Sequence, residues 1–247
     1  MYIFTFIIGL IIGSFLNVII YRLPLNDSIV LPSSHCPNCK TRLKFFDLIP
    51  VISYIFTKGK CRYCGEKISL IYPIVEILTA LLFLLTFLKY GLNTEFVIML
   101  ILISSLIVVS FIDLKYQIIP NIITFSFIPM GLILAIIFSH ITFINSLLGL
   151  IIPAGILLLI AFIYKKGMGI GDVKLIGMIG VFIGWKYALI SIFIGALIGS
   201  AYGIYMMLTD KMTRKTKIPF GPFISSGAVI MILWGDVLIN WYVGFFL

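Results

Sequence analysis

Charged residues are scarce in this chain of 247 amino acids: only 11% are Asp, Glu, Lys or Arg, whereas soluble proteins average about a quarter. Hydrophobic residues make up 62%, and the mean hydropathy is +1.21. We therefore expect an integral membrane protein. The net charge of +9 would suggest nucleic-acid binding in a soluble protein, but here the basic residues cluster between apolar runs, as topology determinants do. We do not expect nucleic acid as a partner.

Histidine is rarer still, because His35 and His140 are the only two in the chain. The sequence accordingly has no H-E-x-x-H zinc-protease motif, and it also lacks the G-x-S-x-G motif of serine hydrolases. A Ser–His intramembrane protease would have to use His140, which we expect on the outer side of the membrane without a partner serine. The missing motifs argue against a zinc protease and a serine hydrolase, and the lack of a partner serine for His140 argues against a Ser–His intramembrane protease.

The first apolar run, residues 1–21, lacks the basic leading region and the small-residue cleavage site of a secretory signal peptide. We expect a retained transmembrane helix whose N-terminus lies outside. The stretch 175–208 would form a helix of about 51 Å, too long for one crossing, and Gly184-Trp185-Lys186 offers a break. We predict an all-α polytopic membrane protein with about eight transmembrane helices, near residues 1–21, 70–88, 96–112, 122–139, 146–163, the two halves of 175–208, and 223–247.

The basic residues are distributed unequally between the loops. If alternate loops are assigned to opposite sides of the membrane, sixteen of the eighteen Lys and Arg residues fall on one side, and only Lys89 and Lys186 on the other. Positive residues mark the cytoplasmic side. The segments that we expect in the cytoplasm are 24–69, 113–121, 165–174 and 209–222.

All four cysteines lie in one of these loops, as two C-x2-C pairs. Two such pairs can supply the four sulfurs of a tetrahedral zinc site. Disulfides are the alternative, but they are rare in the reducing cytosol. We predict a structural zinc ion, because four sulfur ligands leave no open coordination position. The predicted ligands are Cys36, Cys39, Cys61 and Cys64.

Only nine residues are acidic. Five fall in loops, where a solvated side chain needs no special account: Asp27, Asp47, Glu66, Glu95 and Asp210. An ionisable group at membrane depth is a functional candidate. Four acids qualify: Glu76, Asp113, Asp172 and Asp236. We expect Asp236, toward the outer end of the last helix, to be structural or exposed.

Asp113 and Asp172 share one membrane face at similar depth. Two neighbouring carboxylates cannot both ionise easily, so an ionised one can activate water while a protonated one donates to a carbonyl oxygen. This is the chemistry of aspartyl proteases. Pro120 and the glycines at 167, 169 and 171 permit unusual backbone shapes at the pair, yet they are also what simple turns contain. The spacing of Gly195, Gly199 and Gly203 predicts a smooth helix face for close packing.

These residues resemble the type IV prepilin peptidases over nearly the whole chain. The segments that carry the resemblance, in family order, are GSFLNVIIYRLP (13–24), CPNC, GKCRYCG (59–65), ISLIYPIVEILTALLF (68–83), the Asp113 segment ending in IPN, GMGIGDVKL and KIPFGPF (217–223). The resemblance implies Asp113 and Asp172 as catalytic residues and the four cysteines as zinc ligands. It also implies a bifunctional enzyme of the bacterial cytoplasmic membrane with its active sites facing the cytoplasm. Such an enzyme cleaves the leaders of type IV prepilins and pseudopilins and N-methylates the new terminus with S-adenosyl-L-methionine.

The resemblance divides the chain into a first transmembrane helix (1–23), a zinc-binding loop associated with methyl transfer (24–69), a second helix with a short outer loop (70–95) and a peptidase core (96–247). Glu76 is a weak candidate for lining the methyl-transfer site and could equally be a packing acid. Two alternatives remain: an ion-coupled transporter that uses Asp113 and Asp172 as cation sites, and a scaffold that docks partners through its zinc loop.

Overall fold

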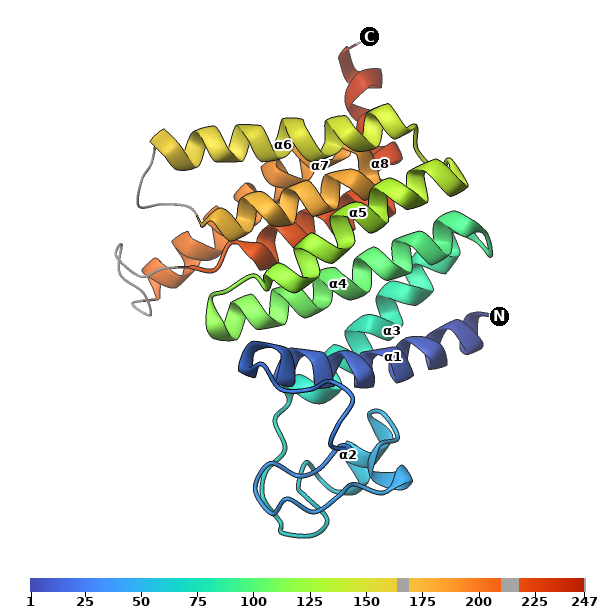
Figure 1. The fold of residues 1–247 in the computed structure, drawn as a ribbon, viewed down its shortest axis with the longest axis vertical. Coiled ribbons are helices and arrows are strands. Elements are labelled where there is room, and N and C mark those ends of the chain that lie inside the picture. The colour runs from blue at the N-terminus through green and yellow to red at the C-terminus, as the bar shows by residue number, and fades with distance from the viewer. Residues whose placement is uncertain (164–168, 210–217, 247) are drawn as a thin grey trace. The chain divides into compact units, whose positions relative to one another are not determined.

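The computed structural model describes residues 1–163, 169–209 and 218–246, and helices account for most of them (Figure 1). In these ranges seven helices are long and apolar enough to cross a membrane. They are α1 (Tyr2–Arg22), α3 (Ile71–Tyr90), α4 (Thr94–Tyr116), α5 (Asn121–Phe138), α6 (Phe143–Ile163), α7 (Ile170–Leu208) and α8 (Gly221–Phe246). Three short elements connect α1 to α3: η1 (Leu23–Leu25), η2 (Phe45–Asp47) and α2 (Ile52–Phe56). The predicted all-α polytopic membrane fold is confirmed.

The chain forms two compact units, Met1–Leu92 and Asn93–Leu247. In the first, α1 and α3 pack so closely that a Cβ atom on Gly9 would lie 2.5 Å from the Cα of Ala80. A Cβ atom on Gly13 would lie 2.7 Å from the Cα of Glu76. Small residues permit such an approach between membrane helices. The glycine of the GSFLN segment therefore lets α1 lie directly against the turn of α3 that carries Glu76.

In the second unit, α7 reverses direction at Gly184, whose φ of 80° and ψ of 166° are not helical. A Cβ atom on Gly184 would lie only 2.7 Å from the side-chain nitrogen of Asn145, whose Oδ1 accepts the backbone N–H of Trp185 at 3.4 Å. The part of α7 before Gly184 packs on α6, and the part after it packs on α8. Both ends of α7 accordingly lie at the left of Figure 1. The predicted break is confirmed.

The returning half of α7 carries the three glycines spaced four residues apart. A Cβ atom on Gly195 would lie 2.7 Å from the carbonyl oxygen of Phe223, and one on Gly199 would lie 3.2 Å from the Phe223 ring. The start of α8 thus rests on this face, which confirms the predicted packing surface. Near its other end, α8 is tied to the same half of α7, because the Tyr187 hydroxyl donates to the carboxylate of Asp236. Asp236 has a structural partner.

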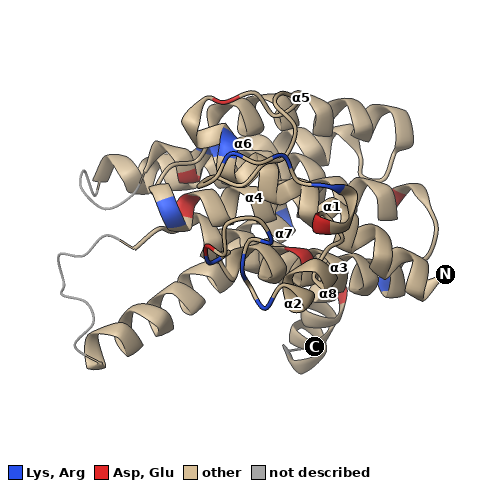
Figure 2. Cartoon of the chain, turned by 90° about the horizontal axis from the view of Figure 1, so that it is seen from below, with Lys and Arg blue, Asp and Glu red and all other residues tan. Residues whose placement is uncertain are grey.

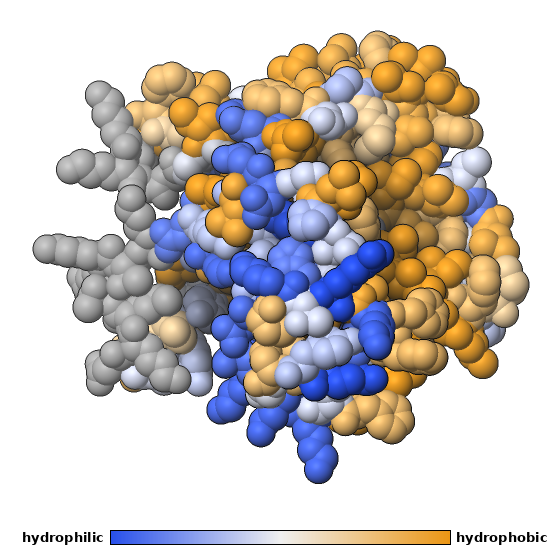
Figure 3. All heavy atoms as spheres, turned by 60° about the horizontal axis from the view of Figure 1, so that its bottom comes forward, coloured by the Kyte–Doolittle hydropathy of each residue, from blue (hydrophilic) through white to orange (hydrophobic). Residues whose placement is uncertain are grey.

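Charge is confined largely to the loops. Figure 2 shows Lys and Arg along the connection between α1 and α3, and Figure 3 shows the hydrophilic surface gathered there, with apolar surface over the helices. Many outward side chains of the spans are large and apolar, such as Phe162 and Leu159, which suits a lipid environment. Gly167 and several of the expected cytoplasmic charges lie outside the described residues: Lys165, Lys166, Asp210, Lys211, Arg214, Lys215 and Lys217.

Candidate active site and metal centre

Asp113 lies in the last turn of α4 and is 5% exposed. The helix ends at Tyr116, because Gln117 takes a left-handed conformation (φ 54°) and Pro120 then precedes α5. The Oδ2 atom of Asp113 accepts the backbone N–H of Gly221, the first residue of α8, at 3.0 Å. A hydrogen bond between residues 108 positions apart therefore fixes this carboxyl group.

Asp172 lies in the first turn of α7 and is 8% exposed. Its Oδ2 accepts the backbone N–H of Gly169 at 3.3 Å, which satisfies one of the donors that a helix leaves free at its N-terminus. Because of this cap, α7 begins at Ile170, five residues before the apolar stretch from which we expected the helix. The glycine-rich segment thus holds Asp172 at the helix end.

Ile119 links the two aspartates. A Cβ atom on Gly171, next to Asp172, would lie 3.1 Å from the Cβ of Ile119, and one on Gly221 would lie 3.4 Å from its Cδ1. The connection between α4 and α5 consequently packs against Gly171, which adjoins Asp172, and against Gly221, whose N–H bonds to Asp113. Two buried carboxyl groups that lie close together are suited to sharing a proton. The structure thus places Ile119 between the neighbour of Asp172 and the hydrogen-bond partner of Asp113, and the catalytic pairing of the two aspartates stays a prediction.

The two cysteine pairs form matching turns in the first unit. In the first turn, Cys36 N–H donates to Thr41 and Lys40 N–H donates back to Cys36. In the second, Cys61 N–H donates to Glu66 and Gly65 N–H donates back to Cys61. The residue after each second cysteine has a positive φ: 55° at Lys40 and 73° at Gly65. The repeated geometry places both sulfurs of each pair on the same side of a tight turn.

The four sulfurs are arranged as metal ligands. All four Sγ atoms lie within 4.8 Å of one another, and those of Cys36 and Cys64 are 3.9 Å apart. A disulfide requires about 2.05 Å, and the cysteines are free. Tetrahedral zinc with bonds of about 2.3 Å separates its sulfurs by roughly 3.8 Å. The residues therefore fit a metal ion bound by four cysteines, and the alternative of a disulfide is not observed.

The ionisation of the cysteines also suits a metal. Hydrogen bonds with Thr41 lower the pKa of Cys39 to about 6, so this sulfur is a thiolate at neutral pH. A backbone hydrogen bond involving Glu66 favours the thiolate of Cys64, but desolvation and the neighbouring sulfurs outweigh it and raise the pKa of Cys64 to about 11. Four crowded sulfurs cannot all be negative without a cation among them. A bound metal ion would supply that charge.

Asp47 corrects one expectation, because we predicted a solvated loop side chain. It is only 8% exposed, and its Oδ2 accepts the Tyr63 hydroxyl at 2.8 Å and the Lys44 N–H at 3.0 Å. Its Oδ1 pairs with Arg62 at 3.2 Å. Burial opposes ionisation, but these hydrogen bonds and the Arg62 charge prevail and lower the pKa of Asp47. The side chain ties η2 to the second cysteine turn, a contact that no spacing in the sequence indicates.

Glu76 points from α3 into the cysteine-containing part of the same unit. Its Oε2 accepts the backbone N–H of Val51 at 2.7 Å, and the side chain is 7% exposed. One helical turn earlier, Tyr72 uses its carbonyl oxygen to accept the side-chain amide of Asn17 on α1 at 3.0 Å. On sequence grounds Glu76 is only a weak candidate, and no spacing indicates that it bonds to Val51 or that Asn17 bonds to Tyr72.

Comparison with known proteins assigns both units. The family model described as the bacterial peptidase A24 N-terminal domain matches residues 7–90, and that of the type IV leader peptidase family matches residues 100–204. The chain is 37% identical to a prepilin leader peptidase/N-methyltransferase of Bacillus subtilis, over 96% of both chains. It is 32% identical to the Legionella pneumophila protein of that name, over 100% of this chain and 96% of the relative. This chain belongs to the type IV leader peptidase family.

Within this family assignment, the two matched regions separate the two candidate sites. Residues 7–90 contain the four cysteines and Glu76, whereas residues 100–204 contain Asp113 and Asp172. A Pseudomonas putida prepilin leader peptidase/N-methyltransferase is 30% identical over 93% of this chain and 89% of its own. No solved structure matches the chain. The relatives cover both matched regions, so they support an enzyme with both parts.

Proposed function

We propose that this chain removes the leader peptides of type IV prepilins and pseudopilins and then N-methylates the new terminus. It would act in the bacterial cytoplasmic membrane, with its sites facing the cytoplasm. The peptidase assignment is supported by the packing of Ile119 against both Gly171, next to Asp172, and Gly221, which bonds to Asp113. Both aspartates lie in the region that matches the leader peptidase family. The same match argues against the transporter alternative, in which these aspartates would bind a cation.

The two carboxyl groups divide the work of amide hydrolysis. Each Oδ2 is oriented by a backbone N–H, of Gly221 for Asp113 and of Gly169 for Asp172, and we assign the reaction to the other oxygens. The ionised carboxylate takes a proton from water, whose oxygen attacks the scissile carbonyl. The protonated carboxyl donates to the carbonyl oxygen. When the tetrahedral intermediate collapses, the C–N bond breaks and the leaving nitrogen takes the proton that the first carboxylate removed from water. A hydroxyl of the intermediate returns a proton to the second carboxylate.

Substitution of either aspartate tests the pair. We expect Asp113→Asn and Asp172→Asn each to abolish leader removal from a co-reconstituted prepilin, because an amide cannot take the proton from water. Asp236→Asn is the matched control: it replaces an acid of the same unit that is bonded to Tyr187 and should leave cleavage intact. Substantial cleavage by either of the first two variants would show that the pair is not catalytic.

We assign structural zinc to Cys36, Cys39, Cys61 and Cys64, supported by the mutual distances of their sulfurs. The metal would hold the two turns together in a loop where large apolar side chains such as Phe45 and Phe56 are exposed. We assign S-adenosyl-L-methionine as the methyl donor. Mass spectrometry of the mature pilin should show one added methyl group that depends on this donor, and a pilin that stays unmethylated would leave the chain a peptidase only.

A further inference from the structure

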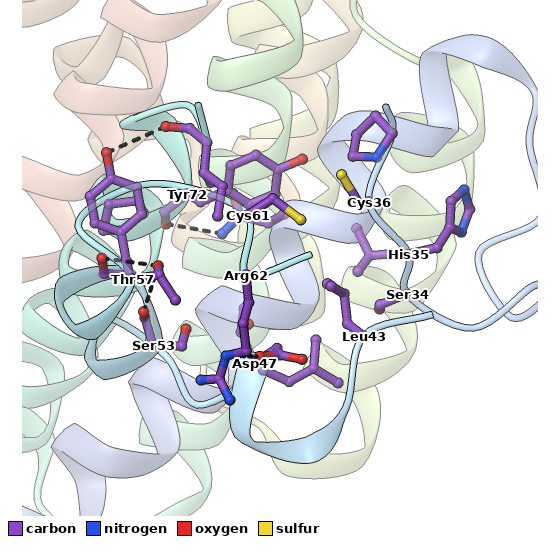
Figure 4. Close-up of a pocket in the computed structure, with 18 of the residues that line it drawn as sticks. Ser34, His35, Cys36, Leu43, Asp47, Ser53, Thr57, Cys61, Arg62 and Tyr72 are labelled. Carbon is purple, nitrogen blue, oxygen red and sulfur yellow. Dashed lines mark hydrogen bonds and ion pairs between the residues drawn. The ribbon is translucent and has the colours of Figure 1, made fainter. Parts of the chain in front are cut away.

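A cavity of about 210 Å³ lies within the first unit (Figure 4). It is found where the loop that carries the four cysteines (residues 24–69, the cysteine loop) meets α1 and α3. Figure 4 shows Cys36, Cys61 and Tyr72 around it, together with the ion pair of Asp47 and Arg62. The lining combines aromatic rings with numerous polar and charged groups, which can orient a small molecule. The proposed peptidase pair belongs to the other unit, so leader cleavage gives this cavity no role.

Two acids with buried side chains line the cavity: Asp47, which pairs with Arg62, and Glu76. Among the residues that the structure describes, no Lys or Arg forms an ion pair with it. Its hydrogen-bond partners are neutral: the Ser14 side chain and the backbone N–H of Val51, whose backbone is held at φ 61° and ψ −48°. A β-branched residue rarely adopts a positive φ, so the loop accepts local strain in aiming this N–H at the carboxylate. A buried carboxylate with a neutral partner is suited to a cationic ligand.

The other lining groups suit different parts of one ligand. Tyr21, Tyr54 and Tyr72 line the cavity, and tyrosine rings can stack on a purine and attract a cation. Arg22, 7% exposed, also lines it and donates from one terminal nitrogen to the carbonyl oxygens of Ser28 and Ile29. A guanidinium group carries five N–H donors, so others remain for a ligand carboxylate.

We propose that this cavity binds S-adenosylmethionine and that Glu76 faces its sulfonium group. The assignment rests on the proposed methyltransferase function and gives it a place in the fold. A purine, an amino-acid carboxylate and a sulfonium cation are the three recognition elements of this molecule. The tyrosine rings match the purine, Arg22 matches the carboxylate, and Glu76 matches the sulfonium cation.

The charge on Glu76 also suits the reaction. The lone pair of the neutral N-terminal amine forms the N–CH3 bond, while the C–S bond breaks and its electron pair stays on sulfur as a neutral thioether. The positive charge thus moves from sulfur to nitrogen, and the new ammonium group then releases a proton to water. A carboxylate beside this path stabilises the cation before and after transfer, most strongly where water is excluded.

Glu76→Gln separates a charge effect from a packing effect. Glutamine keeps the shape and the acceptor for the Val51 N–H but removes the negative charge. We expect the Kd of S-adenosylmethionine, measured by equilibrium dialysis with the full-length protein in nanodiscs, to rise about tenfold or more. The Kd of S-adenosylhomocysteine, which lacks the sulfonium charge, should change less than about twofold. An unchanged affinity for both, or an equal loss of both, would overturn the role of Glu76.

A second pair of variants tests the cavity itself. Val18→Trp fills it from α1 and should weaken the binding of both molecules about tenfold or more, whereas Ile11→Trp alters an exposed position of the same helix outside the cavity and should not. Leader cleavage by each variant reports that the protein is folded. Normal binding by folded Val18→Trp would place the methyl donor elsewhere and leave the proposed function intact. Wild-type protein that neither binds the donor nor methylates pilin would overturn both.

Discussion

Gly221 offers a steric test of the aspartate pair that leaves both carboxyl groups in place. Its N–H donates to Asp113 Oδ2, and a Cβ atom added to it would lie 2.7 Å from that oxygen. Ordinary van der Waals contact begins at 3.4 Å, so in Gly221→Ala the carboxylate must move by about 0.7 Å. Misplacing a reacting group by about 1 Å lowers a rate about a hundredfold. We therefore expect leader cleavage to slow roughly tenfold to a hundredfold.

The assay is the initial rate of leader removal from a reconstituted prepilin, followed by mass spectrometry. Gly155→Ala is the matched control, because a Cβ atom at Gly155 in α6 meets nothing within 4 Å and should not alter the rate. Binding of S-adenosylmethionine should also be unchanged in Gly221→Ala, since the cavity belongs to the other unit. Cleavage at the wild-type rate would refute the argument that the Gly221 backbone positions Asp113.

Three further predictions concern stability and the metal. Gly149→Ala should destabilise the protein by at least about 1–3 kcal/mol in thermal unfolding, because its Cβ would overlap the carbonyl oxygen of Gly180 on α7. Gly155→Ala, on the same helix, should leave the stability unchanged. Equal stability of the two variants would contradict the packing of α6 on α7. Elemental analysis should find about one zinc per chain and none after Cys61→Ser, whereas near-zero zinc in wild-type protein would exclude the metal site. Asp47→Ala should lower the stability of the cysteine loop by about 1 kcal/mol, seen as faster hydrogen exchange over 44–64, because Tyr63 and Lys44 lose their acceptor. Glu66→Ala, an exposed acid of the same loop, should exchange like wild type.

The sequence predicted the features that depend on local chemistry. Long apolar runs predicted the positions of the helices, and Gly184 predicted the point where α7 breaks. The C-x2-C spacing predicted that the four sulfurs lie together. The helix ends were less predictable. Hydropathy alone would start α7 at residue 175, but the helix begins at Ile170, because Asp172 caps it through the Gly169 N–H. The unequal distribution of Lys and Arg between the loops predicted that Asp113 and Asp172 lie on the same side of the membrane.

The lateral contacts could not be predicted in this way. Membrane helices are apolar on the lipid side as well as on the packed side, so periodicity does not reveal which face meets which neighbour. The partner of Asp113 is a backbone N–H of Gly221, and the partner of Glu76 is that of Val51. Backbone donors have no sequence signature. Asp47 was misjudged for a related reason, since only the folded cysteine loop brings Tyr63 and Arg62 to it.

The division of the chain at Leu92 and Asn93 has a kinetic consequence. Under our assignments one unit cuts the pilin and the other modifies the end that the cut exposes, so each pilin has to visit two sites in a fixed order. Cut but unmethylated pilin is then an obligatory intermediate that can leave the enzyme between the two steps. Its abundance would be set by competition between re-binding and escape along the membrane. A shortage of methyl donor should consequently lead to mature pilins with unmodified ends and leave uncut precursor levels unchanged.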